Sequence, residues 1–340
     1  MPTTDTTEKG LETLILESLV HDAGYVQGQS EDFDRDHAVD LAQLVKFIKA
    51  TQPDAAQALG LDEDGPKRLQ FLHRLQGEIA RRGVIDVLRN GVKHGPITVE
   101  LFYGTPTPGN EKAEDRFAAN IFSVTRQLRY SKDETQLALD ACLFINGLPI
   151  ATFELKNRLT KQTVEDAVQQ YKRDRDPREL LFQFGRCAVH FAVDDQEVRM
   201  CTHLKGKDSW FLPFNLGWND GAGNPPNEHG LKTDYLWKRI LTKAELTDIL
   251  ENYAQVVEEK DDRGRKKHRQ VFPRYHQLDV VRKLLADARV SGVGRRYLVQ
   301  HSAGSGKSNS IAWLAHQLVG LQKDGQPVFD SVIVVTDRRV

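Results

Sequence analysis

The sequence predicts an α/β protein in which a mixed central sheet between helices is followed by the beginning of a second α/β domain. Helical and strand-like hydrophobic patterns alternate over about the first 210 residues. An entirely polar stretch, EEKDDRGRKKHRQ at 258–270, then interrupts them, and a Gly-Ser-rich loop follows. We therefore expect a first domain at 1–257, a charged linker at 258–272 and the front part of a second domain at 273–340.

The elements of the first domain follow from the spacing of its apolar residues. LETLILESLVHDAGY (11–25) has helical spacing, whereas ITVELFY (97–103) alternates as a strand does. TVEDAVQQYKRDR (163–175) opens with Thr163 and Asp166 at the spacing of a capping box, which indicates a helix start. The other expected elements are helices at 38–52, 66–83, 113–131 and 233–257 and strands at 137–145, 150–156, 186–193 and 197–204.

The composition is that of an ordinary globular protein, with 39% apolar and 28% charged residues. The net charge of −1 argues against a uniformly basic nucleic-acid binder, and local basic clusters such as 172–175 are each interpreted as solvated faces. No apolar run reaches the roughly 18 residues of a membrane span, and the N-terminus lacks the pattern of a secretory signal. Cys142, Cys187 and Cys201 form no CxxC pair, so we expect buried reduced thiols and a cytoplasmic protein without membrane contact.

A phosphate-binding loop is predicted at HSAGSGKS (301–308), which follows a strand-like run and opens a helix-like one. Small residues at 303–306 allow backbone N–H groups to turn toward phosphate oxygens, and the helix N-terminus adds partial positive charge. Lys307 is expected to reach the β- and γ-phosphates of ATP, and Ser308 to ligate Mg²⁺. His301 stands where the motif has its first glycine. The ATP-binding candidates in this loop are Gly304, Ser305, Gly306, Lys307 and Ser308.

The surroundings of this loop predict an incomplete motor. We expect a helix at 273–290, a strand at 295–300 and a further strand at 331–340. A two-lobed ATP-driven translocase also needs an acidic Mg²⁺-binding motif and a second lobe, which one further strand does not supply. We therefore interpret the 340 residues as the front part of a longer protein and do not expect this part to hydrolyse ATP by itself.

Three charged residues, Asp140, Glu154 and Lys156, interrupt apolar strand-like runs in the pattern D-x13-E-x-K. The spacing alone also fits a solvent-facing hairpin edge. However, Asp140 has apolar neighbours, where an unpaired carboxylate would cost on the order of several kcal/mol. A Mg²⁺ ion between the two carboxylates would offset this cost and supply a water nucleophile for phosphodiester hydrolysis. Lys156, on the same strand face as Glu154, would orient the nucleophile or stabilise negative charge.

The turn between the two strands decides whether the carboxylates meet. A two-residue turn at Asn146–Gly147 with a regular ladder would set Asp140 opposite Phe153, on the wrong side from Glu154. A three-residue loop or a β-bulge would set Asp140 opposite Glu154. Pro149 lacks an N–H group and argues against a regular hairpin. We predict the longer loop or a bulge, and carboxylates on opposite faces would exclude the metal site.

Several stretches together resemble one protein family. The element order with D…ExK resembles the core of the PD-(D/E)xK nucleases. VTRQLRYS, LFINGLPIATFELKN, CAVHFAVDD, FLPFN and GAGNPP, followed by HSAGSGKS, resemble the R (restriction) subunit of type I restriction-modification enzymes over nearly the whole chain. The resemblance implies a PD-(D/E)xK endonuclease domain at 1–257 and the N-terminal part of a first RecA-like helicase or motor domain at 273–340.

The resemblance also assigns residues. The catalytic residues that it implies are Asp140, Glu154 and Lys156. Glu12, on the first helix, would join Asp140 and Glu154 at the metal, and Gln277 in RYHQ would contact the adenine of ATP. The family's Q-x-x-x-Y motif is not matched, because Gln169, Gln170 and Tyr171 are adjacent here. Gln170 and Tyr171 are therefore candidates for a contact to the DNA backbone or for a position behind the carboxylates.

By this resemblance the chain is expected to be the DNA endonuclease subunit of an ATP-dependent type I restriction enzyme, a type I site-specific deoxyribonuclease. It would hydrolyse double-stranded DNA with Mg²⁺ and, in the full-length protein, translocate DNA with ATP. Methyltransferase and specificity subunits would recognise the site, in agreement with the lack of a base-reading motif. Two alternatives stay open: a DNA-binding or docking module with a degenerate nuclease fold attached to a helicase-type motor, and a nucleotide-regulated enzyme for small molecules. The intact D…ExK pattern favours the nuclease.

Overall fold

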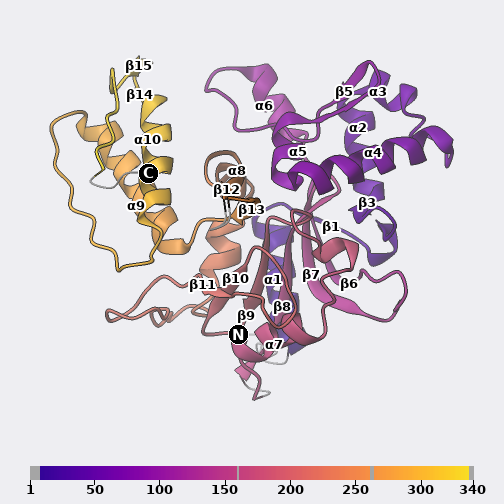
Figure 1. Cartoon of the computed structure of the whole chain (residues 1–340), viewed down its shortest axis with the longest axis horizontal. Coiled ribbons are helices and arrows are strands. Elements are labelled where there is room, and N and C mark those ends of the chain that lie inside the picture. Colours follow the sequence, from indigo (N-terminus) through magenta and orange to yellow (C-terminus); the bar gives the residue numbers. More distant parts are fainter. Residues whose placement is uncertain (1–7, 159–160, 261–263, 337–340) are drawn as a thin grey trace. The chain divides into compact units, whose positions relative to one another are not determined.

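The computed structural model describes residues 8–158, 161–260 and 264–336, and Figure 1 traces the chain through its helices and strands. The chain divides into two compact units, Met1–Phe272 (unit 1) and Pro273–Val340 (unit 2). No helix in the described ranges is long and apolar enough to cross a membrane.

In its described part, unit 1 is built on a seven-stranded mixed sheet with the order β1-β6-β7-β8-β9-β10-β11. Its strands are β1 (Val26–Gln27), β6 (Phe122–Arg129), β7 (Ala138–Ile145), β8 (Leu148–Leu155), β9 (Val189–Val193), β10 (Val198–Cys201) and β11 (Leu212–Pro213). The pairs β1/β6 and β8/β9 are parallel, and the other pairs are antiparallel. Every residue of the central strand β8 is buried, which explains why its sequence is a continuous apolar run.

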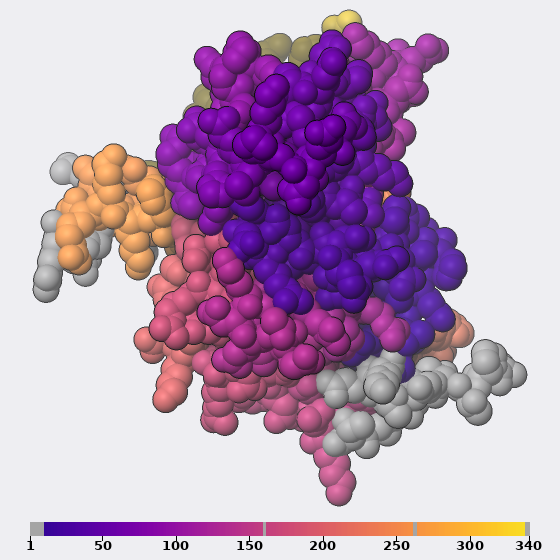
Figure 2. All heavy atoms as spheres, turned by 90° about the vertical axis from the view of Figure 1, so that its right-hand side faces the viewer, coloured from indigo at the N-terminus to yellow at the C-terminus, as the bar shows by residue number. Residues whose placement is uncertain are grey.

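Helices lie around this sheet (Figure 1). They are α1 (Glu8–Glu17), α2 (Leu41–Thr51), α3 (Pro53–Ala58), α4 (Pro66–Arg82), α5 (Val84–Asn90), α6 (Glu111–Ala118), α7 (Val164–Arg173) and α8 (Lys243–Asn252), with π-helical turns η1 (Ser18–Asp22) and η5 (Leu236–Ile240) and 3-10 turns η2 (Ser30–Asp32) and η4 (Leu180–Phe182). Helix α7 packs against β8 and β9, and α1 packs against β6 and β8. In Figure 2 the segment from α2 to α5, coloured indigo to purple, forms the upper part of the face shown.

Short antiparallel pairs complete unit 1: β2 (Phe33–Asp34) with β3 (Val39–Asp40), β4 (Val92–His94) with β5 (Ile97–Val99), and β12 (Gln255–Lys260) with β13 (Lys266–Val271). Cys142, Cys187 and Cys201 are buried and free, as predicted. Cys142 and Cys187 belong to the apolar core that α7 forms with the sheet.

The helix expected at 113–131 is wrong over its second half. Helix α6 ends at Ala118, and Phe122–Arg129 is the strand β6. Its apolar residues fit the spacing of a helix and of a strand about equally well. Pairing with β7 along nearly the whole of β6 decides for the strand, because that pairing satisfies the backbone hydrogen-bonding groups of both elements.

The residues expected as a long helix and a charged linker fold back on one another. The helix predicted at 233–257 is divided into η5, α8 and the start of β12. The linker expected at 258–272 contains the rest of β12 and the whole of β13. Residues 261–263 lie outside the described ranges. The acidic half of this segment pairs with the basic half, as where Lys266 Nζ lies 3.0 Å from Glu258 Oε1. Opposite charges across an antiparallel ladder favour a hairpin over an extended linker.

Unit 2 contains α9 (Tyr275–Ser291), α10 (Lys307–Val319) and the short pair β14 (Gln322–Lys323) and β15 (Gln326–Pro327). The strands expected at 295–300 and 331–340 are not formed in their described residues, and 337–340 lie outside them. Leu298 is 93% and Ile333 82% exposed. A strand needs a neighbour for its backbone hydrogen bonds, and no described strand pairs with either segment.

Candidate active site

A β-bulge sets the register of the two strands that carry the acidic pair. The opposed residues of β7 and β8 are Ile145–Leu148, Phe144–Pro149, Leu143–Ala151, Cys142–Thr152 and Ala141–Phe153. The turn therefore has two residues, and Ile150 is the additional residue of the bulge. The recorded pairs end at Ala141–Phe153, and extending this register by one residue sets Asp140 opposite Glu154. The predicted bulge is confirmed, and the alternative three-residue loop is not formed.

The Asn146–Gly147 turn is fixed by its surroundings. Both residues have left-handed backbone conformations, with φ of 51° and 82°, as a two-residue hairpin turn requires. The buried Asn146 side chain donates from Nδ2 to the Leu101 carbonyl oxygen at 2.9 Å. A Cβ atom at Gly147 would come within 2.4 Å of the Asp40 carbonyl oxygen. The strands thus cannot slip without disrupting contacts outside the hairpin.

The two carboxylates have different surroundings. Asp140 Oδ2 accepts a hydrogen bond from the Leu155 backbone N–H at 2.7 Å. Glu154 is fully buried, and its Oε1 accepts from Arg175 Nε at 2.6 Å. The other oxygen of Glu154, Oε2, is buried and has no hydrogen-bond partner within the described part of the protein. Burial, aided by the charge of Asp140, raises the pKa of Glu154 to about 8, although Arg175 and Lys156 act in the opposite direction.

Lys156 follows β8 on the same side of the strand as Glu154. Its side chain is mostly buried, and its backbone N–H donates to the Val193 carbonyl oxygen at 2.9 Å. The fully buried carboxylate of Asp194 accepts from the first backbone N–H of α7, at Val164, at 2.9 Å. Asp194 therefore ties the beginning of α7 to the end of β9, next to the strand end that carries Lys156. Asp194 was not predicted as a site residue, although it stands in AVDD directly after an expected strand.

Glu12 is linked by a hydrogen bond to Gln127 of β6, the strand that neighbours β7 and Asp140. Gln127 Nε2 donates to Glu12 Oε1 at 2.7 Å. Gln127 lies in β6 between Arg126, which pairs with Ala141, and Leu128, which pairs with Leu139, and its φ of 48° is unusual for a non-glycine residue in a strand. No three or more His, Cys, Asp or Glu side chains of the described ranges gather as a metal site. The structure thus brings Asp140 and Glu154 together, Glu12 contacts Gln127 on the neighbouring strand, and the role of Glu12 at a metal ion stays a prediction.

Helix α7 packs against β8, the strand that carries Glu154, and its candidate residues differ in how deeply they are buried. Tyr171 is fully buried, and its hydroxyl lies 2.8 Å from Thr152 Oγ1 on β8. Gln170 is half-buried on the same helix. Arg175, interpreted from sequence as part of a solvated basic cluster, is buried against Glu154 instead. The sequence pattern placed Arg175 four residues after Tyr171 in the expected helix 163–175, one turn further on the same face, and this spacing was the signal that could have revealed it.

The residues present fit a hard divalent cation. The donor atoms are carboxylate oxygens, which Mg²⁺ prefers, and Mg²⁺ commonly uses one or two carboxylates together with water and substrate phosphates. The unpartnered Glu154 Oε2 is the buried polar atom that such an ion would satisfy. Asp140 and Glu154 are therefore the residues that would hold the ion.

The loop at 301–308, which the sequence predicts to bind phosphate, precedes α10. Gly306 is the N-cap of this helix, with φ of 81°, and Lys307 is its first residue. Lys307 Nζ donates to the carbonyl oxygens of His301 (3.1 Å) and Ser302 (2.9 Å), so the ammonium group closes the loop. Ser308 is exposed in the first turn. The loop therefore keeps the lysine beside the curved backbone that was expected to surround phosphate.

The start of α9 braces this loop. Gln277 is buried, and its Nε2 donates to the carbonyl oxygens of Gly306 at 2.9 Å and Ser305 at 3.2 Å. Arg274 Nη2 donates to the Gly304 carbonyl oxygen at 2.8 Å. A Cβ atom at Gly306 would lie 2.3 Å from Gln277 Nε2. The structure thus brings Gln277 to the loop, where it contacts backbone carbonyls.

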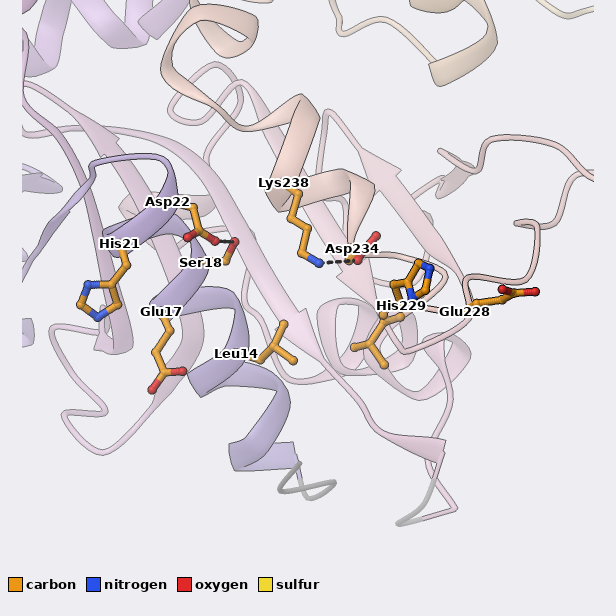
Figure 3. A pocket seen from close by; sticks show the side chains of 11 residues that line it. Leu14, Glu17, Ser18, His21, Asp22, Glu228, His229, Asp234 and Lys238 are labelled. Atoms are coloured by element: carbon orange, nitrogen blue, oxygen red, sulfur yellow. Dashed lines mark hydrogen bonds and ion pairs between the residues drawn. The ribbon is translucent and has the colours of Figure 1, made fainter. Parts of the chain in front are cut away.

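A separate pocket of 980 Å³ lies between α1–η1 and the segment 228–238 (Figure 3). Its charged side chains are partly paired: Ser18 Oγ donates to Asp22 Oδ2 at 2.9 Å and Lys238 Nζ to Asp234 Oδ2 at 2.7 Å. None of the candidate catalytic residues lines this pocket. The pocket is therefore separate from the site of Asp140 and Glu154 in unit 1.

The fold and site define an α/β protein with an acidic pair on two central strands, and comparison with known proteins identifies its family. The family model described as "Type I restriction enzyme R protein N terminus (HSDR_N)" matches residues 5–209. This match covers more than half of the 340 residues, and the chain belongs to that family, as the N-terminal region of an R subunit.

Curated relatives carry the same family name. The putative type I restriction enzyme MjaVIIIP endonuclease subunit of Methanocaldococcus jannaschii is 26% identical over 277 residues, which are 79% of this chain and 25% of that protein. The type I restriction enzyme HindI endonuclease subunit of Haemophilus influenzae is 25% identical over 231 residues, 66% of this chain and 21% of the relative. The chain thus spans about a quarter or less of the length of these relatives.

Proposed function

We propose that unit 1 is the Mg²⁺-dependent DNA endonuclease part of an ATP-dependent type I restriction enzyme, with a PD-(D/E)xK nuclease fold. The observation that carries the proposal is the bulge that sets Asp140 opposite Glu154 while Glu154 Oε2 has no hydrogen-bond partner in the described residues. Membership in the R-subunit family and relatives named as endonuclease subunits support the same assignment.

The proposed roles follow from position and chemistry. Asp140 and Glu154 hold Mg²⁺, which supplies an activated water and neutralises charge on the phosphodiester. Lys156 orients the attacking water or stabilises the negative charge that develops on the phosphate oxygens. The buried surroundings strengthen these interactions, because a low local dielectric weakens screening.

The rest of the proposal concerns the longer protein. Unit 2 is the beginning of a RecA-like motor domain in which Lys307 and Ser308 hold the phosphates and Mg²⁺ of ATP, while Gln277 contacts the adenine or braces the loop. ATP-driven translocation brings double-stranded DNA to unit 1. Methyltransferase and specificity subunits select the DNA site. The protein acts in the cytoplasm, where its DNA substrate is found. The phosphate-loop contacts of Lys307 and Gln277 support this part of the proposal.

Supercoiled-plasmid cleavage by the full-length subunit, assembled with its methyltransferase and specificity subunits, tests the nuclease assignment. Asp140→Ala is expected to lower the cleavage rate by at least about a hundredfold, as loss of a metal ligand in a catalytic site does. Asp133→Ala, which changes an exposed aspartate outside the site, is the matched control and should cleave like wild type.

Equal cleavage by wild type and Asp140→Ala would contradict the assigned site. A wild-type complex that binds and translocates DNA without cutting it at any Mg²⁺ concentration would favour the alternative function, a docking module with a degenerate nuclease fold.

A further inference from the structure

Arg175 makes one contact with each nitrogen of its guanidinium group. It lies two residues beyond the end of α7 and is only 4% exposed. Nε donates to Glu154 Oε1 at 2.6 Å, Nη1 donates to the Tyr130 hydroxyl at 3.2 Å, and Nη2 donates to the Ala138 carbonyl oxygen at 2.8 Å. The guanidinium carbon also lies 5.5 Å from the centre of the Tyr130 ring.

These contacts join the three strands that form the site. Tyr130 follows the last residue of β6, Ala138 is the first residue of β7, and Glu154 lies in β8. The planar guanidinium group holds its donors in a fixed fork, so its three contacts determine one orientation. A lysine has one nitrogen on a flexible chain and cannot reproduce this geometry.

The contact with Glu154 is asymmetric. Buried arginine–carboxylate pairs are frequently bidentate, and both carboxylate oxygens then receive a hydrogen bond. In this pair only Oε1 receives one, and Oε2 is left without a hydrogen-bond partner among the described residues, next to the strand that carries Asp140. An arginine that served stability alone gains nothing from this arrangement, since an unsatisfied buried oxygen is costly.

We propose that Arg175 is a positioning residue for the metal ligand Glu154. By holding Oε1 it fixes the carboxylate so that Oε2 is presented to a divalent cation shared with Asp140. The inference rests on the proposed function, because it needs Glu154 to be a metal ligand. It adds a residue outside D…ExK on which cation affinity depends.

Cation binding without DNA tests this role independently of cleavage. The probe is Mn²⁺, titrated calorimetrically into the 340-residue chain without nucleotide. Arg175→Lys is expected to weaken Mn²⁺ binding by about tenfold or more, because mutation of a residue that hydrogen-bonds to a metal ligand commonly has an effect of this size. Arg173→Met removes an exposed arginine from the same helix and should bind Mn²⁺ like wild type.

Glu154→Gln separates the two ways of failing. If Glu154→Gln loses Mn²⁺ binding while folded Arg175→Lys binds like wild type, Arg175 has no positioning role and the metal site stands. If Glu154→Gln also binds like wild type, the metal site of the proposed function is wrong.

Tyr130→Phe provides a second test if Arg175→Lys does not fold, which the lack of a cooperative unfolding transition would show. This change removes the Nη1 contact without leaving a buried charge unpaired, and a loss of roughly two- to fivefold in Mn²⁺ affinity is expected from one hydrogen bond. A folded Tyr130→Phe variant with wild-type affinity would then overturn the proposal.

Discussion

At the residue scale, the site depends on how a fully buried glutamate is accommodated. Glu154 receives one hydrogen bond from Arg175 through Oε1, while Oε2 is unsatisfied in the described part of the chain. Burial therefore raises the pKa of Glu154 to about 8 despite the neighbouring arginine. The free energy of a cation-free site is thus expected to depend on pH.

The sign of this dependence follows from proton binding. Between the ordinary pKa of 4.5 and the folded value of about 8, the folded protein keeps the Glu154 proton that the unfolded chain releases. The folded state binds more protons in this window, so the stability contribution of Glu154 falls as pH rises. Without divalent cations, the wild type should lose on the order of several kcal/mol relative to Glu154→Gln between pH 5 and 8.

Urea unfolding in EDTA at a series of pH values, with wild type and Glu154→Gln side by side, measures this difference. A constant stability difference across the window would contradict the assigned burial effect. The comparison with the glutamine variant removes the contributions of titrating groups that do not interact with Glu154.

At the element scale, the hairpin β7–β8 carries the site because its turn and its bulge are both fixed. The two-residue turn alone would place Asp140 opposite Phe153, and the bulge at Ile150 corrects the register by one residue. Gly147 closes the turn with φ of 82° directly against the Asp40 backbone. The register of the acidic pair is thus determined at the turn end of the hairpin.

Gly147→Ala is expected to destabilise the protein by about 2–4 kcal/mol, because the new Cβ combines a strained backbone with a clash 2.4 Å from the Asp40 carbonyl oxygen. Chemical denaturation measures the loss. Gly77→Ala, inside α4 with no atom within 4 Å of the added Cβ, is the control and should stabilise by roughly 0.5–1 kcal/mol. A neutral Gly147→Ala variant would show that the turn does not constrain the hairpin.

Much of the element pattern was predictable, because periodicity identifies isolated helices and strands well. The predictions failed where pairing partners decide. The run 122–129 has helical as well as strand spacing and became a strand beside β7. The charged segment 258–270 became a hairpin through pairs such as Glu258–Lys266. In both cases the paired strand supplied the interactions, and the spacing of apolar residues within one segment does not contain them.

At the scale of the whole molecule, the chain contains two units with separate candidate sites. The acidic pair belongs to Met1–Phe272, and the predicted phosphate-binding loop belongs to Pro273–Val340. The contacts described above for each site come from its own unit. We therefore expect changes in one site to leave ligand binding at the other unchanged.

Lys307→Ala tests this independence. Removing the ammonium group is expected to weaken binding of ATP by roughly tenfold or more, since a charge-assisted hydrogen bond contributes about 1.5–3 kcal/mol, whereas Mn²⁺ binding by unit 1 should not change. Calorimetric titration with each ligand measures both. The control is Lys283→Ala, which changes an exposed lysine of α9 paired with Asp279. Equal ATP affinities of wild type and Lys307→Ala would contradict the phosphate-loop assignment.

Residue types and spacing alone predicted the order of most elements, the D…ExK pattern, a phosphate-binding loop and the family resemblance. These features depend on residue types and local spacing, which a sequence contains directly. The folded chain was needed to show that a bulge, not a longer loop, sets the register of Asp140 and Glu154, and that Arg175 is buried against Glu154. Register and burial depend on which segments pair and pack in the folded chain. The position of a charged residue in the sequence therefore does not reveal whether its side chain is exposed to water or contacts another side chain.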